Sequence, residues 1–258
     1  MTAQANQQEW NYLWTNLQDN DEWLFRAWIH PNTLESFAAK TVMDAGCGPG
    51  HHSRLSARFA KRVVGVDLNT SPIAREKLKD LPNVEIVSGD IAKWDTGERF
   101  DVVYSVGVVH HTQNPDATAE HLKTLVKPGG RIIFWLYSRE GNGFVYWVLE
   151  PLKKYFLDHL PRGVVMFLSH ILTVVGSILM QTFYRLPLPE NFPYYSYCKN
   201  LRDSTYQRRL LNVFDKLNAP TTHLITEAQA RSWVAGWKDA HVDFYVGTSW
   251  RVSGTKPG

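Results

Sequence analysis

A glycine-rich run followed by an aspartate is the part of this chain best suited to bind a small ligand. The run VMDAGCGPG covers residues 42–50. Gly46, Gly48 and Gly50 carry no side chain, so a ligand can approach the backbone closely there. Asp67, at the end of the next strand-like run, can accept hydrogen bonds from ribose hydroxyls. Together these residues indicate a nucleoside site, although a glycine-rich turn alone would fit a simple tight turn equally well.

Two pairs of histidines accompany this pattern. His110 and His111 directly follow a strand-like run, and a neutral imidazole there can take a proton from a hydroxyl or an ammonium group near pH 7. We expect one of this pair to be a general base. The alternative is that both only orient the following turn through hydrogen bonds. His51 and His52 open a helix, where they could reach a ligand carboxylate or face solvent.

Metal binding is not expected. A metal ion held by these histidines together with Asp67 or Asp90 would compete with the nucleoside for the same carboxylates. The composition excludes other classes of partner. Twenty-eight basic residues are scattered among twenty-five acidic ones, which gives no basic stripe for nucleic acid.

Strand-like and helix-like runs alternate through the middle of the chain, as is typical of a doubly wound α/β sheet. Helical patterns begin near Ser71-Pro72 and after Asn114-Pro115, and KPGG acts as a breaker before the fifth strand. A helix over 226–237 then precedes two runs close enough to form an antiparallel hairpin. The expected strands cover residues 41–46, 62–67, 84–89, 100–107, 131–137, 241–247 and 248–254.

A nicotinamide dehydrogenase is the competing enzyme class for such a sheet. Its fingerprint, G-x-G-x-x-G, uses the third glycine for close packing of the helix. Here His51 occupies the third position, and the spacing is G-x-G-x-G instead. The turn therefore lacks the pattern expected for a dinucleotide pyrophosphate.

Several motifs taken together resemble the class I S-adenosylmethionine-dependent methyltransferases, of the small-molecule type found in ubiquinone biosynthesis. The motifs are DAGCGPG, Asp67, GDI at 89–91, FDVVYSVGVVHH, and KPGG before RIIFWLY, and they cover about residues 40–137. The resemblance implies a mainly parallel seven-stranded sheet with an antiparallel last strand. It also implies S-adenosylmethionine as cofactor at the carboxyl ends of the central strands.

The resemblance assigns cofactor roles along these motifs. Asp44 would face the methionine amino group through the glycine-rich loop, Asp67 would hold the ribose, and Asp90 would accept from the adenine amino group. A helix cap is the alternative role for Asp90. The methionine moiety would be lined by Gly46, Cys47, Gly48 and Gly50. The adenine ring would pack on Leu68 and Ile91. The sulfonium would lie near Val106 and Gly107.

The activity implied is methyl transfer to an oxygen or nitrogen atom of a small-molecule, glycan or lipid-linked acceptor. Because this is an in-line displacement, the protein must chiefly align the acceptor and exclude water. A non-catalytic binding partner that keeps the fold is the alternative from another functional class.

Four regions are expected: an aromatic helical cap over 1–38, the cofactor-binding core over 39–140, a helical insertion over 141–225, and a closing helix and hairpin over 226–258. The core is committed to cofactor, so the cap and insertion should select the acceptor. The residues we expect on the acceptor side are Trp14, Tyr137, Tyr194, Tyr195, Asp215 and Asn218.

The insertion contains an unusual uncharged stretch, residues 163–184, between Arg162 and Arg185. Its length suits a membrane span, but Ser169, Thr173 and Ser177 recur every four residues and draw a polar stripe. A lid or a homodimer helix is the expectation, with peripheral membrane contact and a true span as alternatives.

The cysteine content and the first thirty residues bear on location. Cys47 and Cys198 are too few and too far apart for a disulfide framework, which fits a reducing cytoplasm. The first thirty residues contain four acidic side chains and no apolar core, so they do not resemble a secretory signal.

Overall fold

The computed structural model describes residues 22–258, which divide into two compact units. The first, which we call the core unit, contains the described residues up to Tyr137, residues 221–243 and residues 250–258. The second, the helical unit, contains residues 138–220 and the short stretch 244–249. Residues 8–21, where a first aromatic helix is expected, lie outside the described residues, as does Trp14.

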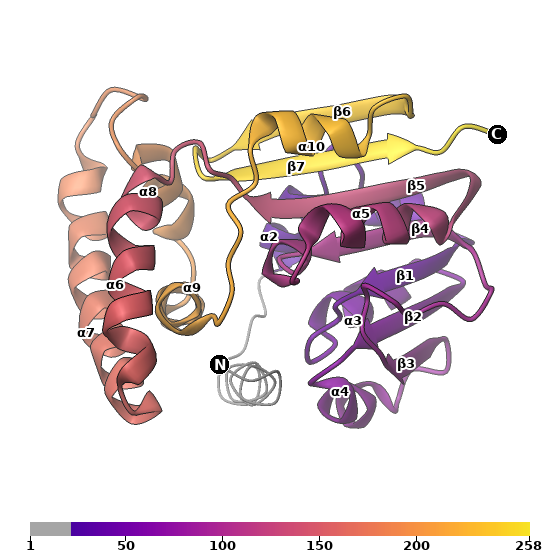
Figure 1. Ribbon diagram of the computed structural model, residues 1–258, viewed down its shortest axis with the longest axis horizontal. Coiled ribbons are helices and arrows are strands. Elements are labelled where there is room, and N and C mark those ends of the chain that lie inside the picture. Colours follow the sequence, from indigo (N-terminus) through magenta and orange to yellow (C-terminus); the bar gives the residue numbers. More distant parts are fainter. Residues whose placement is uncertain (1–21) are drawn as a thin grey trace. The chain divides into compact units, whose positions relative to one another are not determined.

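A seven-stranded sheet organises the core unit, with the strand order β3-β2-β1-β4-β5-β7-β6 (Figure 1). The pairs β1–β2, β1–β4, β2–β3 and β4–β5 are parallel, and β7 runs opposite to β5. The predicted doubly wound, mainly parallel sheet is therefore confirmed. The strands are β1 (Thr41–Ala45), β2 (Arg62–Asp67), β3 (Val84–Ser88), β4 (Phe100–Val106), β5 (Val126–Tyr137), β6 (Lys238–Tyr245) and β7 (Ser249–Thr255).

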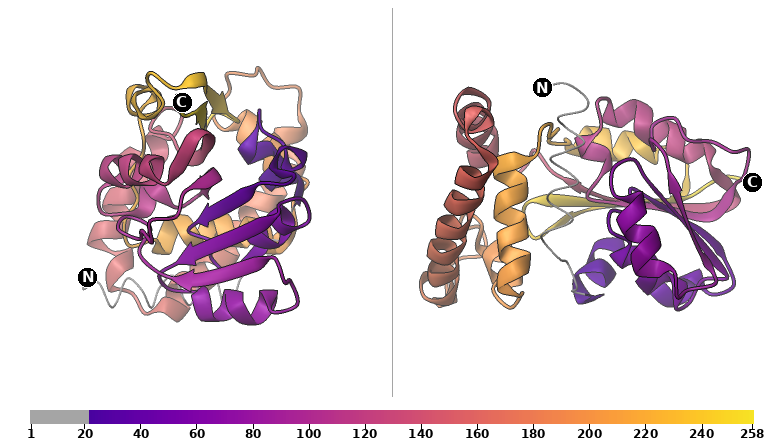
Figure 2. Two further views of the ribbon diagram at one scale, coloured as in Figure 1. Left: turned by 90° about the vertical axis from the view of Figure 1, so that its right-hand side faces the viewer. Right: turned by 90° about the horizontal axis from the view of Figure 1, so that it is seen from below.

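Helices lie on both sides of this sheet (Figure 2). Successive side chains of a strand point to opposite faces of the sheet, so both faces have residues for helices to cover. Val103 joins the core beneath α5 on one face. Its neighbour Tyr104 stacks on Phe37 on the opposite face, with the ring centres 6.0 Å apart. The α-helices of this unit are α2 (Glu22–Ile29), α3 (His51–Ala57), α4 (Ser71–Leu78), α5 (Pro115–Thr124) and α10 (Glu227–Trp233), joined by the short 3₁₀ turns η1 (Leu34–Phe37) and η2 (Val109–His111).

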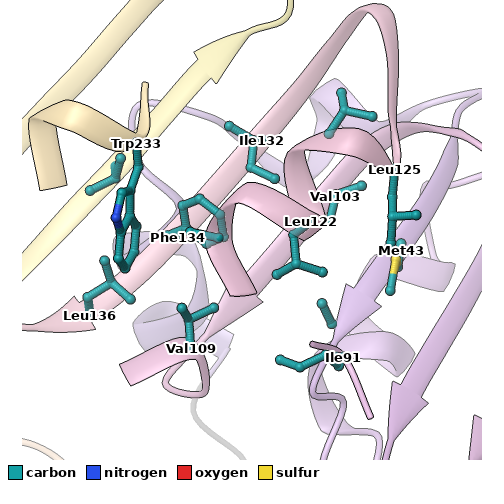
Figure 3. Packing of buried hydrophobic residues seen from close by; sticks show 14 of the residues in the cluster. Met43, Ile91, Val103, Val109, Leu122, Leu125, Ile132, Phe134, Leu136 and Trp233 are labelled. Carbon is teal, nitrogen blue, oxygen red and sulfur yellow. The ribbon is translucent and has the colours of Figure 1, made fainter. Parts of the chain in front are cut away.

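The larger hydrophobic core lies between the sheet and helices α5 and α10 (Figure 3). Leu122 of α5, Phe134 of β5 and Trp233 of α10 are buried there. The Trp233 ring meets Phe134 edge-on at 5.5 Å, and its Nε1 donates to Asp116 Oδ1 at 2.7 Å, so the polar atom of a buried ring is satisfied. These contacts fix the closing helix against strands that carry the site.

Local signals in the sequence account for most of the helix starts. Asn114 accepts from the Ala117 amide and Pro115 takes the first helical position, while Thr226 and Gln229 form a capping box before α10. Two expectations were wrong in detail. The KPGG breaker lies inside β5, where a register shift between Phe100 and Val102 accommodates the extra residues, and α10 ends at Trp233 instead of 237.

The helical unit confirms that the insertion is largely helical. Its elements are η3 (Val145–Leu149), α6 (Glu150–Tyr155), η4 (Leu157–His159), α7 (Arg162–Gln181), η5 (Phe183–Arg185), α8 (Tyr195–Leu201) and α9 (Tyr206–Asn218). Helices α7 and α9 pack on one another around a small core that includes Val165, Leu210 and Phe214. The unit thus has its own hydrophobic cluster.

We expect the substitution Leu122→Ala to lower the free energy of unfolding by about 2–5 kcal/mol, because it leaves a cavity under α5. Leu122 is fully buried among sheet residues. Chemical denaturation followed by near-ultraviolet circular dichroism would measure the change. Glu120→Ala, at an exposed position on the same helix, should change stability by about 0.5 kcal/mol or less. Equal effects of the two substitutions would contradict this account of the core.

Candidate functional site

The glycine-rich run forms the turn between β1 and α3. Gly46, Gly48 and Gly50 have φ angles of +89°, +53° and +88°, a conformation that favours glycine. The amides of Gly46 and Cys47 donate to the Val66 carbonyl at 2.8 and 3.1 Å, which ties the turn to β2. The backbone of this turn is therefore fixed by its own hydrogen bonds.

Packing within the chain supplies a second reason for two of these glycines. A Cβ atom on Gly46 would lie 2.5 Å from a methyl group of Val108, and one on Gly50 would lie 2.5 Å from a methyl group of Leu78. The sequence suggested that glycine leaves room for a ligand. The structure adds that neighbouring side chains already occupy the space beside Gly46 and Gly50.

Asp67 lies at the carboxyl end of β2 with both carboxylate oxygens fixed. Its Oδ2 accepts from the Gly48 amide at 3.0 Å, and its Oδ1 accepts from the amides of Asn69 and Thr70 at 2.8 and 2.7 Å. A carboxylate oxygen can accept more than one hydrogen bond, so Oδ2 can still receive one from a ribose hydroxyl. Beside it, Leu68 is 46% exposed and presents an apolar surface.

Asp90 and Ile91 follow β3 in a turn. Asp90 Oδ1 accepts from the Ala92 amide at 3.0 Å, so this carboxylate does cap the backbone, although of a turn and not of a helix. Ile91 is buried in the main core. Their roles toward adenine stay predictions.

Asp44 is buried beneath the glycine-rich turn, where Ser53 Oγ of α3 donates to its Oδ2 at 2.7 Å. Burial raises the pKa of this carboxyl to about 7, against the opposing effect of hydrogen bonds from Ser53 and Tyr104. A buried carboxyl of this kind would gain from a nearby cation. It is thus chemically suited to an amino group, as the sequence suggested.

The Cys47 side chain points into the protein. Its sulfur would lie 3.0 Å from a Cβ placed on Gly65, and it clusters with Ile86 and Leu78. Burial holds the pKa of the thiol well above its usual value. Any contribution of Cys47 to ligand binding would come from its backbone.

β4 ends at Val106 and pairs with β1, the strand that leads into the glycine-rich turn. Gly107 then turns the chain with φ of +76°. The Gly107 amide donates to the Trp135 carbonyl at 3.0 Å. This bond fixes the start of the segment that carries the histidine pair.

The two histidines of η2 have different environments. The His110 ring is fully buried, with its centre 4.2 Å from the His111 ring and 4.4 Å from the Tyr137 ring. His111 is half-buried, and its Nδ1 lies 2.7 Å from the Thr221 carbonyl oxygen. A carbonyl can only accept, so Nδ1 carries the proton in neutral His111 and Nε2 is the basic atom. His111 is therefore the better candidate for a general base.

Sequence reasoning missed an aromatic row at this end of the sheet. Trp28 of α2 packs on Trp135 with ring centres 4.7 Å apart, and Trp135 meets Tyr137 at 5.4 Å. His52 stacks on Phe25 at 4.3 Å. The alternation of β5 could have placed Trp135 and Tyr137 on one face, but nothing in the sequence joined Trp28 to them.

The other expected acceptor residues belong to the helical unit. Tyr194 precedes α8 with φ of +59°, Tyr195 begins α8, and Asp215 and Asn218 lie on α9. Asp215 is buried. Among the expected acceptor residues that the structure describes, only Tyr137 shares the core unit with the histidine pair, and the acceptor roles of all of them stay predictions. Within residues 22–258, no three His, Cys, Asp or Glu side chains are grouped so as to hold a metal ion.

Comparison with known sequences matches residues 43–134 to the family model described as "Methyltransferase domain". Ubiquinone biosynthesis O-methyltransferase from Stutzerimonas stutzeri is 31% identical over 133 residues, which are 50% of this chain and 56% of that protein. The protein of the same name from Acinetobacter baumannii is 29% identical over 133 residues, or 49% of this chain and 55% of that one. The chain thus spans about half the length of the curated relatives it matches.

Two solved structures show the same fold at low sequence identity. An O-methyltransferase family protein from Burkholderia thailandensis superposes with a TM-score of 0.52 and 15% identity, covering 92% of this chain and 56% of that one. The N-methyltransferase NodS from Bradyrhizobium japonicum superposes with a TM-score of 0.50 and 11% identity, covering 92% and 97%.

The contribution of packing at Gly50 to the folding free energy can be separated from the contribution of its φ angle by comparison with Gly97. Gly97 has a similar φ of +82° but no atom within 4 Å of a Cβ placed on it. We expect Gly97→Ala to cost about 1–2 kcal/mol of folding free energy through φ alone. Gly50→Ala should cost about 1–3 kcal/mol more, because Leu78 must move. Denaturant titration would measure both, and equal losses would show that the Leu78 contact is unimportant.

Proposed function

We propose that this chain, whose residues 43–134 form a class I methyltransferase domain, transfers the methyl group of S-adenosylmethionine to an oxygen atom of a small molecule. The observation that carries the proposal is a pair of carboxylates at the glycine-rich turn: Asp44, which is buried beneath the turn and accepts from Ser53 of α3, and Asp67, which accepts from the Gly48 amide. The names of the matched relatives support oxygen as the acceptor atom.

The residues of the site fit the three chemically distinct parts of this cofactor. Asp44 would pair with the methionine ammonium, and Asp67 would accept from the ribose hydroxyls. Leu68 offers an exposed apolar face for adenine. Asp90 follows Gly89, whose amide donates to the Asp67 carbonyl at 3.2 Å, and its carboxylate would accept from the adenine amino group. When bound, the cofactor supplies an electrophilic methyl group on a sulfonium.

The chain's own residues would align the acceptor and remove its proton. An acceptor oxygen held in line with the methyl carbon would displace the sulfur as a neutral thioether, which keeps the electron pair of the broken carbon–sulfur bond. His111 Nε2 takes the hydroxyl proton, and the Thr221 carbonyl stabilises the resulting imidazolium through Nδ1. His110 acts as a positioning residue that packs between His111 and Tyr137.

We also propose a metal-free site in a protein of the reducing cytoplasm. Both cysteines are free thiols in the described chain, and the charge pattern offers no surface for nucleic acid.

The test of the proposed function is transfer of a labelled methyl group to a panel of phenols, alcohols, amines, sugars and lipids, with the product located by mass spectrometry. If S-adenosylmethionine binds but no acceptor of any class is methylated, the chain is a binding partner and not an enzyme. If activity disappears on chelation, the metal-free proposal fails.

The affinity for S-adenosylmethionine should depend on pH through Asp44. Its pKa is about 7, so below pH 7 the carboxyl becomes neutral and loses its attraction for the ligand ammonium. The dissociation constant should rise up to about tenfold for each unit of pH below 7. Above about pH 8 it should rise again, as the amino group of the ligand loses its proton.

Calorimetric titrations from acid to mildly alkaline pH would measure this dependence. Asp44→Asn is the control, since an amide keeps the size of the side chain but cannot ionise. It should bind more weakly at pH 7.5 and show no loss on the acid side. An unchanged acid limb in this variant would assign the dependence to another group.

His111→Gln should lower the rate of methyl transfer by about 10²–10⁴-fold. Glutamine can still donate to the Thr221 carbonyl but cannot take the acceptor's proton. The affinity for S-adenosylmethionine should be unchanged, and the loss should shrink as pH rises and the acceptor ionises unaided. The matched variant His110→Gln should retain the same pH profile as the parent protein. Identical profiles for the parent and His111→Gln would exclude His111 as the base.

A further inference from the structure

Helix α7 turns its apolar side outward. Within Arg162–Arg185 the chain is long and apolar enough to cross a membrane, yet only 17% of its most apolar stretch is buried. Phe167 and Ile178 are 64% and 58% exposed. A core helix of a water-soluble domain has the opposite arrangement. The exposed large side chains on this helix are Val164, Phe167, Ile171, Leu172, Val174, Val175, Ile178 and Leu179.

The polar stripe predicted on this helix faces inward. Ser169 and Thr173 are buried, and each hydroxyl donates to the carbonyl four residues earlier, at 2.8 and 2.6 Å. Ser177 does the same at 2.6 Å. These side chains therefore satisfy themselves within the helix and do not mark a surface that faces water. The stripe was the reason to favour a lid or a dimer helix, and its inward orientation removes that reason.

The segment that precedes α7 in the helical unit adds exposed aromatic residues. Trp147 is 73% exposed, and Tyr155 and Phe156 are exposed by about two-thirds. Tryptophan and tyrosine favour the boundary between water and lipid, where the ring is buried and the polar atom stays hydrated. Two consecutive segments of one unit thus carry side chains suited to this boundary.

The net charge of the insertion favours an anionic partner. Residues 141–225 contain nine lysines and arginines against five acidic residues, whereas the rest of the chain has nineteen against twenty. A second copy of this surface would bring the same positive charge and be repelled, but an anionic lipid surface would attract it.

We propose that the helical insertion binds the surface of an anionic lipid bilayer, with α7 lying along the interface and its exposed apolar side in the acyl region. The helix does not span the bilayer, because α9 packs along it. Helix α9 carries Arg208, Arg209, Asp215 and Lys216. If α7 spanned the bilayer, α9 would take these charges into the hydrocarbon. This inference stands independently of the proposed methyl transfer.

Sedimentation of the full chain with vesicles, without detergent, tests the proposal. Phosphatidylcholine vesicles containing about one-third phosphatidylglycerol should bind the protein, and pure phosphatidylcholine should bind about tenfold less. Added salt should weaken binding to the anionic vesicles. Equal binding to both vesicle types would overturn the role of charge.

The double variant Phe167→Asp/Ile178→Asp should reduce binding to the anionic vesicles by about tenfold or more, because two charges replace apolar side chains at the interface. Trp23→Asp is the matched control, since Trp23 is 42% exposed but lies on α2, in the core unit. It should bind like the parent. Helical circular dichroism and S-adenosylmethionine affinity, measured on each variant, would show that the fold and the cofactor site are intact.

Two results would overturn the proposal. In the first, neither vesicle type binds, and analytical ultracentrifugation shows a dimer that the double variant abolishes, so that a second copy covers the helix. In the second, the protein resists alkaline extraction from the vesicles, as a spanning helix does. If the parent protein does not bind S-adenosylmethionine, that result would count against the proposed function alone.

Discussion

The site depends on one carboxylate, that of Asp67. By accepting from the Gly48 amide on one oxygen and from the Asn69 and Thr70 amides on the other, it joins the turn after β1 to the turn after β2. Such bonds are charge-assisted and stronger than those between neutral groups. Glycine can adopt several backbone conformations, and these bonds help to hold the glycine-rich turn in one that has three positive φ angles. The geometry available for a nucleoside follows from this connection.

The fixed turn leaves the chemistry to the neighbouring strand ends. β4 and β5 deliver the histidine pair, Trp135 and Tyr137 to the same end of the sheet, and α2 adds Trp28. The His111 and Tyr137 rings pack against the fully buried His110 ring, while the Thr221 carbonyl sets which nitrogen of His111 is basic. The two residues are adjacent and identical in type, so the different roles proposed for the buried ring of His110 and the half-buried ring of His111 rest on packing alone.

The sheet could be predicted because its signals are local. Strand alternation, the helix start after Asn114-Pro115 and the spacing of the glycines each occupy a few residues, and each appears in the structure where expected. The carboxyl ends of the parallel strands then had to meet, which brought Asp44, Asp67 and the histidines to one edge.

What could not be predicted depends on contacts between residues distant in sequence. The bond from His111 to Thr221 joins positions 110 residues apart, and no local pattern distinguishes His111 from His110. The direction of the polar stripe on α7 was likewise open from the sequence, because its side chains could equally have faced water. In the structure Ser169 and Thr173 are buried. Periodicity defines the faces of a helix, but only its neighbours decide which face is buried.

The strand order has a consequence for how the protein is made. β7, which follows the other six strands of this sheet in the sequence, lies between β5 and β6. Until residues 249–255 have been synthesised, the outer edge of β5 has no neighbour to pair with. The whole apolar insertion emerges during this interval, before the sheet can close. The nascent chain therefore exposes an unpaired strand and an outward-facing apolar helix at the same time, and both kinds of surface make a folding intermediate prone to aggregate.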